Sequence, residues 1–424
     1  MPGQSVIEGQ DGEVQAAGIP DQTSAPEVGT VPAQGVPARD RQGGYPARGE
    51  AGQACHLGSA GVREGQEPMQ RHNDDPLVRG NTLLQLNSKI HCAYQIRKGD
   101  SMTPEEVRKA VWRLCMPYAM DRIEQVRKSG TKFVHYTSAF AALQIIEKEK
   151  VWMRNALVMN DFSEVQHGER CLAQSWHDEK VGGKLRETLS KLDPGLVKVI
   201  TENFDSRAID REDFSYLISI SEHGDDKLNE DKYGRLSMWR AYGGSTNVAM
   251  VFNNFPFVNE STALNAYTSP VLYCDEEEFK IHFASMAAGL EQNLELLKTA
   301  GAEIVGHALF MAFHFAALST KHPGFSEERE WRVIHSPTLL PSNKLTFDTE
   351  TIDGVPQRVC KLELKNYPDE GFTGATLPEL LEEIIIGPTQ YPWPIQDALA
   401  RKLEEKQVKD PWSKVRVSSI PLRR

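Results

Sequence analysis

Strand-like and helix-like segments follow one another in uneven groups along this chain, and this order constrains the fold most. Runs rich in aromatic and β-branched residues, typical of strands, stand at 132–137, 216–221 and 330–335. Helix-like stretches lie between them, the longest at 275–320 with a predicted break at Ala300-Gly301. Because strands and helices do not alternate regularly, the pattern predicts an α+β fold: a mixed, largely antiparallel, split sheet with flanking helices.

The composition of the chain changes near residue 80. Residues 1–80 are rich in Gly, Pro, Gln, Ala and Ser and hold few aromatic or branched residues. Such a segment cannot bury enough apolar surface to offset its ordering entropy, so we expect a disordered tail. Cap signals predict a first helix from Pro104 to Ser129. We therefore expect an α+β domain at 100–405, followed by a short strand and tail at 406–424.

Charge and apolar content exclude some classes of protein. The net charge of −11 argues against non-specific adhesion to nucleic acid or to an anionic membrane. No apolar run is long enough for a membrane span, and residues 1–5 lack the basic start of a secretion signal. The cysteines form no Cys-x-x-Cys pair and have no matching His cluster, so we expect free thiols in the cytoplasm and no bound metal. They are Cys55, Cys92, Cys115, Cys171, Cys274 and Cys360.

Glu328 and Glu330 form an acidic pair at the entry of the predicted strand 330–335. Side chains alternate along a strand, so both carboxylates would project from one face. When two carboxyl groups are buried together, one tends to hold its proton. Such a pair suits polarising a sugar hydroxyl or stabilising a developing cation, so we take both as candidate catalytic residues. A charged, solvated strand entry is the alternative interpretation.

Two other predicted strands carry candidate binding residues. His135 could hydrogen-bond a ribose hydroxyl, and the adjacent Tyr136 could pack on a flat ring. Ser219 and Ser221 present two hydroxyls on one strand face, which suits contacts to sugar or phosphate. The alternatives are a core strand with a hydrogen-bonded histidine and an ordinary edge strand.

Two further motifs lie outside these strands. Trp239 and Tyr242 are three residues apart on a helical turn and could sandwich a base, with a packed aromatic corner as the alternative. Asn160, Asp161 and Glu164 resemble a metal ligand set. Their capping-box spacing is a sufficient structural reason for these residues, so no metal site is expected there.

Taken in order, these motifs resemble a bacterial family called domain of unknown function 2971. The resemblance covers roughly residues 130–395. It rests on His135-Tyr136-Thr137-Ser138, Trp152, Asn160-Asp161-x-x-Glu164, Ser219-x-Ser221-Glu222, Trp239-x-x-Tyr242, Glu328-x-Glu330-Trp331-Arg332 and Ile384-Ile385-Ile386-Gly387-Pro388. The name of that family implies no activity.

The layout is also distantly similar to the ADP-ribosyltransferase superfamily. The similarity lies in a strand with a histidine, a middle Ser-x-Ser strand and a late strand entered by Glu-x-Glu. It implies NAD as co-substrate, without a metal, and either ADP-ribosyl transfer or NAD hydrolysis. The first acidic position, Glu328, would orient a nucleophile or a target side chain. The chain departs from that layout in having no evident glycine-rich phosphate loop.

The same resemblance implies roles for the other matched residues. His135 would hold the nicotinamide-side ribose. Ser219 and Ser221 would support the nicotinamide pocket, with Tyr242 stacked on the ring. Glu330 would contact the ribose 2′-hydroxyl and stabilise an oxocarbenium-like transition state. The acceptor stays open among protein, nucleic acid, a small molecule and water.

Two other classes of function compete with this hypothesis. One is a non-catalytic binding module of a phage-defence or stress system, which recognises a partner or a nucleotide. The other is a nuclease that uses His135 with Glu330 and a metal, which the lack of clustered acidic residues disfavours. Convergence of His135 and Glu330 on one cleft would favour an enzyme, and a packed core between them would favour the module.

Overall fold

The structure is a computed structural model. It describes residues 102–158, 162–206, 215–224, 229–242, 244–352 and 354–421. The predictions for residues 1–80 and for Asn160 and Asp161 lie outside these residues. The described part of the chain combines helices with a largely antiparallel sheet, so the predicted α+β class is confirmed.

The helices and strands have the following bounds. The helices are α2 (Pro104–Cys115), α3 (Pro117–Ser129), α4 (Ala139–Lys148), α5 (Phe162–His177), α6 (Val181–Leu192), α7 (Leu196–Ser206), α9 (Glu230–Tyr233), α10 (Leu236–Ala241), α11 (Glu276–Gln292), α12 (Leu294–Ala300), α13 (Ala302–Leu318), α14 (Leu377–Leu380), α15 (Pro392–Glu405) and α16 (Pro411–Lys414). Short 3-10 helices are η1 (Ala156–Val158), η2 (Pro323–Glu328) and η3 (Pro368–Glu370). The strands are β1 (Lys132–Ser138), β2 (Lys150–Asn155), β3 (Tyr216–His223), β4 (Asn247–Phe252), β5 (Tyr267–Pro270), β6 (Leu272–Tyr273), β7 (Thr320–Lys321), β8 (Glu330–His335), β9 (Thr346–Ile352), β10 (Val355–Glu363), β11 (Leu381–Ile386) and β12 (Val415–Val417).

Two predicted helical segments are more broken than their sequences suggest. The first helix does begin after Thr103, whose side chain forms a capping box with Glu106. The prediction of one helix to Ser129 is wrong, because the segment divides at Met116 into α2 and α3. Pro117 has no backbone N–H for an intrahelical bond and is favoured at a helix start, which explains the break.

The predicted break at Ala300-Gly301 in the long helical region is confirmed. Gly301 separates α12 from α13 and has a φ of 87°, a conformation that favours glycine. A second break at Asn293 separates α11 from α12, so the region holds three helices where the sequence predicted two.

Ten of the described strands form one large sheet that forks at β3, and β6 and β7 form a separate two-stranded sheet. The main order of the large sheet is β12-β11-β4-β1-β3-β2-β10-β9, while β8 pairs with β3 and β5 pairs with β8. On one edge, β3 pairs along Tyr216–Ser221 with β8. On the other edge, β1 pairs with the last residues of β3 and β2 pairs with the first. The edge of β3 between these pairings is the split in the sheet, and it opens beside Ser219.

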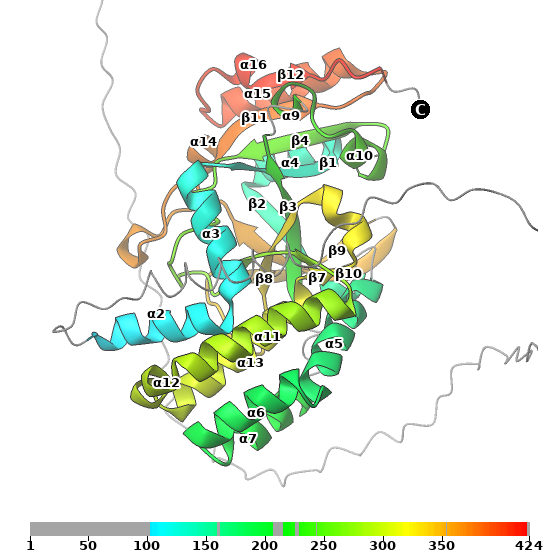
Figure 1. Cartoon of the computed structure of the whole chain (residues 1–424). Helices are drawn as coiled ribbons and strands as arrows, with labels where there is room; N and C mark the ends of the chain where they lie inside the picture. The colour runs from blue at the N-terminus through cyan, green and yellow to red at the C-terminus, as the bar shows by residue number, and fades with distance from the viewer. Residues whose placement is uncertain are drawn as a thin grey trace, which may run out of the picture. The chain divides into compact units, whose positions relative to one another are not determined.

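The helices gather mainly beside one end of the sheet. Figure 1 shows α5, α6, α7, α11, α12 and α13 together at one end and α15 with β11 and β12 at the other. The helices at the first end share one large apolar core with α2, whereas α4, α14 and α15 share another with β4 and β11. A third core, around Phe133, Ile220 and Trp331, lies on one face of the sheet at the fork. The opposite face at the fork carries polar residues.

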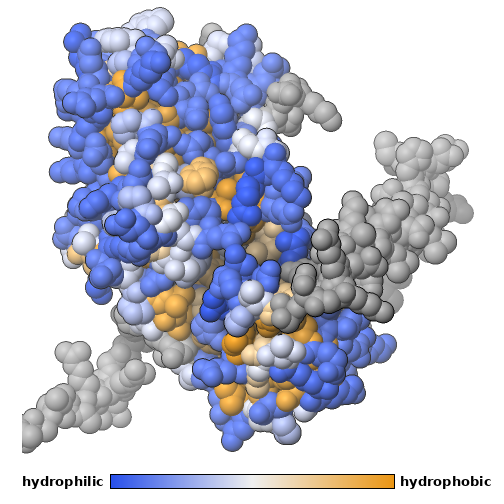
Figure 2. All heavy atoms as spheres, turned by 90° about the vertical axis from the view of Figure 1, so that its left-hand side faces the viewer, coloured by the Kyte–Doolittle hydropathy of each residue, from blue (hydrophilic) through white to orange (hydrophobic). Residues whose placement is uncertain are grey.

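The described part of the chain has a largely hydrophilic face and one apolar pair of helices joined at a sharp bend. The face in Figure 2 is largely hydrophilic, with separate hydrophobic patches. In the described residues, no single helix is long and apolar enough to cross a membrane. Together, α12 and α13 reach the length and apolar character of a membrane span, but the pair bends by 107° at its junction.

Candidate functional site

Glu330, the first residue of β8, is the centre of a buried ionic network. Its Oε1 accepts hydrogen bonds from the Ser219 hydroxyl at 2.5 Å and from Arg332 Nε at 2.9 Å. Its Oε2 accepts from Arg332 Nη2 at 3.2 Å and from Lys321 Nζ at 3.4 Å. The Glu330 backbone N–H donates to the phenol oxygen of Tyr273 at 2.8 Å. Both carboxylate oxygens of Glu330 are therefore held by cations, and its position is fixed from three strands.

Strand pairing explains why these side chains meet. In the β3–β8 register, Ser221 stands opposite Glu330 and Ser219 stands opposite Arg332. Directly opposed residues point to the same face of an antiparallel pair, so all four side chains belong to one face. The two-stranded β6–β7 sheet pairs Tyr273 with Lys321 and brings both to Glu330.

Lys321 connects three carboxylates in this network. Its ammonium lies 2.7 Å from Glu164, 2.6 Å from Glu328 and 3.4 Å from Glu330. Arg332 also forms an ion pair with Glu164, which lies in the first turn of α5. The network thus contains three carboxylates and two cations, and α5 is tied to the sheet through it.

Burial and charge oppose each other at these groups. Burial alone would raise the pKa of Glu330, but the charge and hydrogen bonds of Arg332, the charge of Lys321 and the Ser219 hydroxyl lower it to about 2. Glu330 is therefore ionised at neutral pH, and the expectation that one carboxyl keeps its proton does not apply to it. At Glu164 burial outweighs the nearby cations and raises the pKa above its ordinary value.

Glu328 reaches Lys321 from outside the strand, so the prediction of two carboxylates on one strand face is wrong for it. Glu328 is the last residue of η2, and β8 begins only at Glu330. Arg329 between them has a φ of 46°, in the left-handed region that non-glycine residues rarely occupy. This turn interrupts the strand geometry, and both carboxylates still meet at Lys321.

Arg235 holds the unusual backbone at this turn. It lies just before α10, is almost fully buried, and donates to the Glu328 carbonyl at 2.7 Å and to the Glu222 carbonyl at 2.8 Å. It also pairs with the buried Glu230 at 2.9 Å, and Arg329 forms an ion pair with the same carboxylate. Arg235 and Glu230 therefore stabilise the left-handed turn that places Glu328.

Tyr242 joins the network through Glu328. Its phenol donates to Oε1 of Glu328 at 3.1 Å, and its ring packs beside the cluster that contains Trp239. Burial and the neighbouring Glu328 carboxylate raise the pKa of Tyr242, so the phenol stays protonated and can serve as the donor. Ser219, Tyr242, Glu328 and Glu330 are thus brought together.

His135 lies next to this network but does not face Glu330. Its Nδ1 is 2.9 Å from the Ser219 carbonyl oxygen, at the edge of β3 where the sheet is split. Alternation along β1 assigns His135 to the face of Phe133, and the register Val134–Ser221 assigns Glu330 to the opposite face. Burial lowers the pKa of His135, so the ring is neutral and donates from Nδ1. Ser219 connects the two residues, because its carbonyl oxygen accepts from His135 and its hydroxyl donates to Glu330.

Three other predicted site residues take no part in the hydrogen bonds of this network. Tyr136 packs edge-on against Trp239 with ring centroids 4.9 Å apart, and its phenol oxygen accepts the Arg235 amide at 2.8 Å. Trp239 is fully buried and donates to the Tyr233 carbonyl at 2.9 Å. Ser221 is buried opposite Glu330 but is not one of its hydrogen-bond partners. Tyr136 and Trp239 therefore pack against each other in the core, and a packed aromatic corner was the alternative interpretation for Trp239 with Tyr242.

Lys321, Arg332 and Glu164 were not among the site residues predicted from the sequence. Arg332 follows Glu330 by two residues, so strand alternation alone could have placed it beside Glu330. Glu164 was interpreted as part of a helix cap, whereas its two carboxylate oxygens contact Lys321 and Arg332. Lys321 gives no local signal, because it reaches the network through the pairing of β7 with β6.

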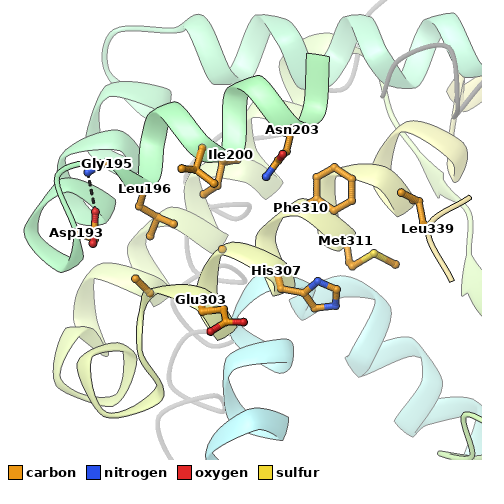
Figure 3. Close-up of a pocket in the computed structure, with 13 residues that line it drawn as sticks. Asp193, Gly195, Leu196, Ile200, Asn203, Glu303, His307, Phe310, Met311 and Leu339 are labelled. Carbon is orange, nitrogen blue, oxygen red and sulfur yellow. Dashed lines mark hydrogen bonds between the residues drawn. The ribbon is translucent and has the colours of Figure 1, made fainter. Parts of the chain in front are cut away.

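A separate pocket lies in the helical layer. It has a volume of about 560 Å³ and lies between α7 and α13. Figure 3 shows Leu196 and Ile200 facing His307 and Phe310 across it, with Asp193, Asn203 and Glu303 among the polar lining residues. A Cβ on Gly306 would lie 2.9 Å from Leu196, so glycine permits this close helix approach. The pocket shares no lining residue with the Glu330 network.

Comparison with known proteins supports the family resemblance for part of the chain. Residues 238–333 match the family model described as protein of unknown function (DUF2971). This confirms the predicted resemblance over a stretch that includes Trp239, Tyr242, Glu328 and Glu330. No curated protein and no solved structure matches the chain. The similarity to ADP-ribosyltransferases stays a prediction.

Proposed function

We propose that this chain is a bacterial ADP-ribosyltransferase-like or NAD-cleaving enzyme, with NAD as its co-substrate. One observation carries the proposal: Ser219, Tyr242, Glu328 and Glu330 belong to a single hydrogen-bonded network through Lys321. The distant similarity to the superfamily assigns roles to these four residues, which lie far apart in the sequence.

The charge state of the network fits the chemistry of NAD cleavage. Breaking the nicotinamide–ribose bond builds positive charge on the sugar, and a fixed carboxylate nearby lowers the energy of that state. Glu330 is ionised at neutral pH, so it can hold Lys321 and accept the Ser219 hydroxyl. The side chain of Glu328 is 16% exposed and that of Glu330 is 6% exposed, so Glu328 is the carboxylate nearer to solvent. We assign contact with the sugar to Glu328, and to Glu330 the anchoring of Lys321 and Ser219.

The aromatic and backbone groups around the carboxylates complete the proposed site. The Tyr242 phenol orients Glu328, and its ring is the candidate stacking surface for nicotinamide. His135 holds the Ser219 carbonyl at the split edge of β3 and thereby orients the serine that bonds Glu330. In this arrangement His135 is a positioning residue, which differs from the ribose contact that the resemblance implies.

A second candidate function is a non-catalytic binding or interaction module in a phage-defence or stress system. The burial of the network favours it. The side chains of Lys321 and Arg332 are each 4% exposed, and both carboxylate oxygens of Glu330 already have a charged partner. A network of this kind can hold α5 and the β6–β7 sheet together without any reaction. Under both candidate functions we place the protein in the cytoplasm, where the buried cysteines would stay reduced.

Nicotinamide release by the purified full-length chain tests the first proposal. We would measure nicotinamide by chromatography in the presence of NAD, and follow ADP-ribose on protein, on nucleic acid and in solution to identify the acceptor. Glu328→Gln and Glu330→Gln keep the shape of each side chain and remove its charge. Each should lower turnover by about two to three orders of magnitude while NAD binding changes little. Glu383→Gln, which breaks the ion pair of Glu383 with Arg416 between β11 and β12, outside this network, is the control and should keep full turnover.

Three outcomes separate the candidates. Nicotinamide release that falls in Glu328→Gln but not in Glu383→Gln supports the enzyme. NAD binding without release, measured by calorimetry, favours the binding module. If the wild type releases nicotinamide and Glu328→Gln, shown to be folded by circular dichroism, keeps the full rate, the assigned site is wrong.

A further inference from the structure

A cluster of soft and borderline metal ligands lies between α5 and α11, apart from the Glu330 network. His167 and Cys171 are four residues apart on α5, and side chains at this spacing share one helix face. Glu276 is the first residue of α11, which packs against α5. One ligand atom from each of the three residues lies within 4.8 Å of the others.

The geometry of this cluster suits a tetrahedral ion. Zn²⁺ binds thiolate sulfur at about 2.3 Å and imidazole nitrogen at about 2.0 Å, which places the two ligand atoms roughly 3.5 Å apart. The Cys171 sulfur lies 3.7 Å from His167 Nε2, close to that separation. The Glu276 side chain is 32% exposed, so it can rotate toward the ion and gives the ion access from solvent.

We propose that His167, Cys171 and Glu276 form a Zn²⁺ site that joins α5 to α11. A thiolate, a carboxylate and a neutral imidazole together balance the charge of one divalent ion, and the set of nitrogen, sulfur and oxygen donors is typical of zinc. Three protein ligands leave a fourth position, which water or the nearby Cys274 carbonyl oxygen can take. The sequence predicted no metal, because its cysteines form no Cys-x-x-Cys pair and have no matching His cluster.

The groups that face this site determine what must change when zinc binds. His167 Nε2 lies 2.9 Å from the Cys274 carbonyl oxygen, and Arg170 Nη2 lies 3.5 Å from His167 Nδ1. Arg170 Nε also donates to Glu276 at 3.1 Å. When zinc binds His167 Nε2, the proton of the neutral imidazole moves to Nδ1, the Cys171 thiol releases its proton to solvent, and the ion replaces Arg170 as the partner of Glu276.

The site would stabilise the helix that carries Glu164. His167 and Cys171 lie one and two turns beyond Glu164 on α5, and Cys274 directly follows Tyr273 of β6. A zinc ion here would fix α5 against the segment that supports Glu330. This inference does not depend on NAD cleavage, because it concerns only the binding of the ion and the stability of the helix pair.

Zinc binding by untagged, full-length protein tests the proposal. The protein is first treated with a chelator and dialysed, and Zn²⁺ alone is then titrated against a chromophoric competitor. We expect one strongly bound equivalent that Cys171→Ser and Glu276→Gln each weaken, by about 100-fold and about 10-fold. Cys360→Ser is the matched control, since Cys360 is a buried thiol on β10 away from this cluster. It should bind zinc like the wild type.

A second readout keeps the test valid if Cys171→Ser does not fold. Saturating zinc should raise the thermal midpoint of the wild type and of Cys360→Ser. It should raise it less in Glu276→Gln, because the partly exposed Glu276 side chain is not needed for folding. Failure of the wild type to bind zinc more tightly than about 10 µM overturns the proposal. Equal zinc affinity in the wild type, Cys171→Ser and Glu276→Gln also overturns it, because the ion would then be bound elsewhere.

Discussion

Ser219 and Glu330 are joined by a hydrogen bond that runs diagonally across two paired strands. The Ser219 hydroxyl lies 2.5 Å from Oε1 of Glu330, although the register sets Glu330 opposite Ser221. Oε1 also accepts from Arg332 Nε, and Arg332 is the residue opposite Ser219. The Glu330 side chain therefore points along the sheet toward Arg332 of the same strand, and Ser219 is the second donor to Oε1 of Glu330.

Replacing Ser219 or Ser221 by alanine should show that only the Ser219 hydroxyl contributes strongly to the free energy of unfolding. Ser219→Ala removes a hydrogen bond to a charged, buried group and should lower the free energy of unfolding by about 1.5–3 kcal/mol. Ser221→Ala, two residues along the same face, should cost less than about 1 kcal/mol and leave Glu330 unaffected. Urea denaturation of both variants measures the difference. Equal losses would show that the Ser219–Glu330 bond contributes nothing specific.

Acid should weaken the fold through Glu330. Its pKa is lowered from an ordinary value of 4.5 to about 2, because the cations and Ser219 outweigh the effect of burial. A carboxyl with a lowered pKa contributes stability above its unfolded pKa and loses that contribution as pH falls through its folded pKa. The contribution, about 3 kcal/mol, should therefore disappear between about pH 4.5 and pH 2.

Comparison with Glu330→Gln isolates this contribution from other acids. Burial raises the pKa of Glu164, so protonation of Glu164 at low pH changes stability in the opposite direction. Glu164 is present in both proteins, so its effect is common to them. We expect the difference in unfolding free energy between wild type and Glu330→Gln to shrink by about 3 kcal/mol from pH 6 to pH 2. Urea titrations at several pH values measure it. A difference that stays constant would contradict the lowered pKa of Glu330.

Lys321 should be the most sensitive residue of the network. Lys321→Met leaves three carboxylates with Arg332 as their one remaining cation in this network, and it should lower the free energy of unfolding by about 3–5 kcal/mol. Adding Glu164→Gln restores the original net charge of the network and should recover part of the loss. Lys361→Met, which removes a more exposed lysine paired with Asp348 and Glu350, should cost less than about 1 kcal/mol.

Thermal and urea unfolding of these three variants test the charge-balance argument. Recovery in Lys321→Met/Glu164→Gln shows that Lys321 acts by neutralising Glu164 and its neighbours. If the double variant is less stable than Lys321→Met, packing of the lysine stem has the larger effect, and the charge-balance argument fails.

The parts of this fold that depend on local pattern follow from the sequence. Thr103 and Glu106 predict the start of α2, and Gly301 predicts the break before α13. Both signals can be recognised in the sequence, because a helix cap or a left-handed glycine affects only the few residues around it. The pairing of β3 with β8 does not follow from local pattern. Without that register the sequence could not show that Ser219 bonds Glu330, and it suggested the contact only through a family layout.

The cations of the site could be predicted less well than its carboxylates. Glu328 and Glu330 stand out as a pair next to a strand, whereas Lys321 reaches them only through the contact of two short strands. The left-handed turn at Arg329 depends on Arg235 and Glu230, which are distant in sequence. Solitary charged residues of this kind have no periodic pattern, so only the three-dimensional structure identifies them.

Two substitutions of Tyr242 should distinguish the effect of its ring on NAD binding from the effect of its hydroxyl on turnover, if the proposed NAD chemistry holds. Tyr242→Phe keeps the ring and removes the donor to Glu328, so NAD affinity should stay within about threefold while turnover falls by about tenfold. Tyr242→Ala removes the ring as well and should weaken NAD binding by about tenfold, the usual effect of losing one stacking partner.

Calorimetry with NAD and nicotinamide release measure the two effects on Tyr242 variants. Tyr391→Ala, at an exposed tyrosine before α15, is the control and should change neither quantity. NAD affinity in Tyr242→Ala that equals the wild type would exclude Tyr242 as the stacking residue. Full turnover in Tyr242→Phe would show that the phenol does not orient Glu328 for the reaction, because the 3.1 Å bond is the contact that this substitution removes.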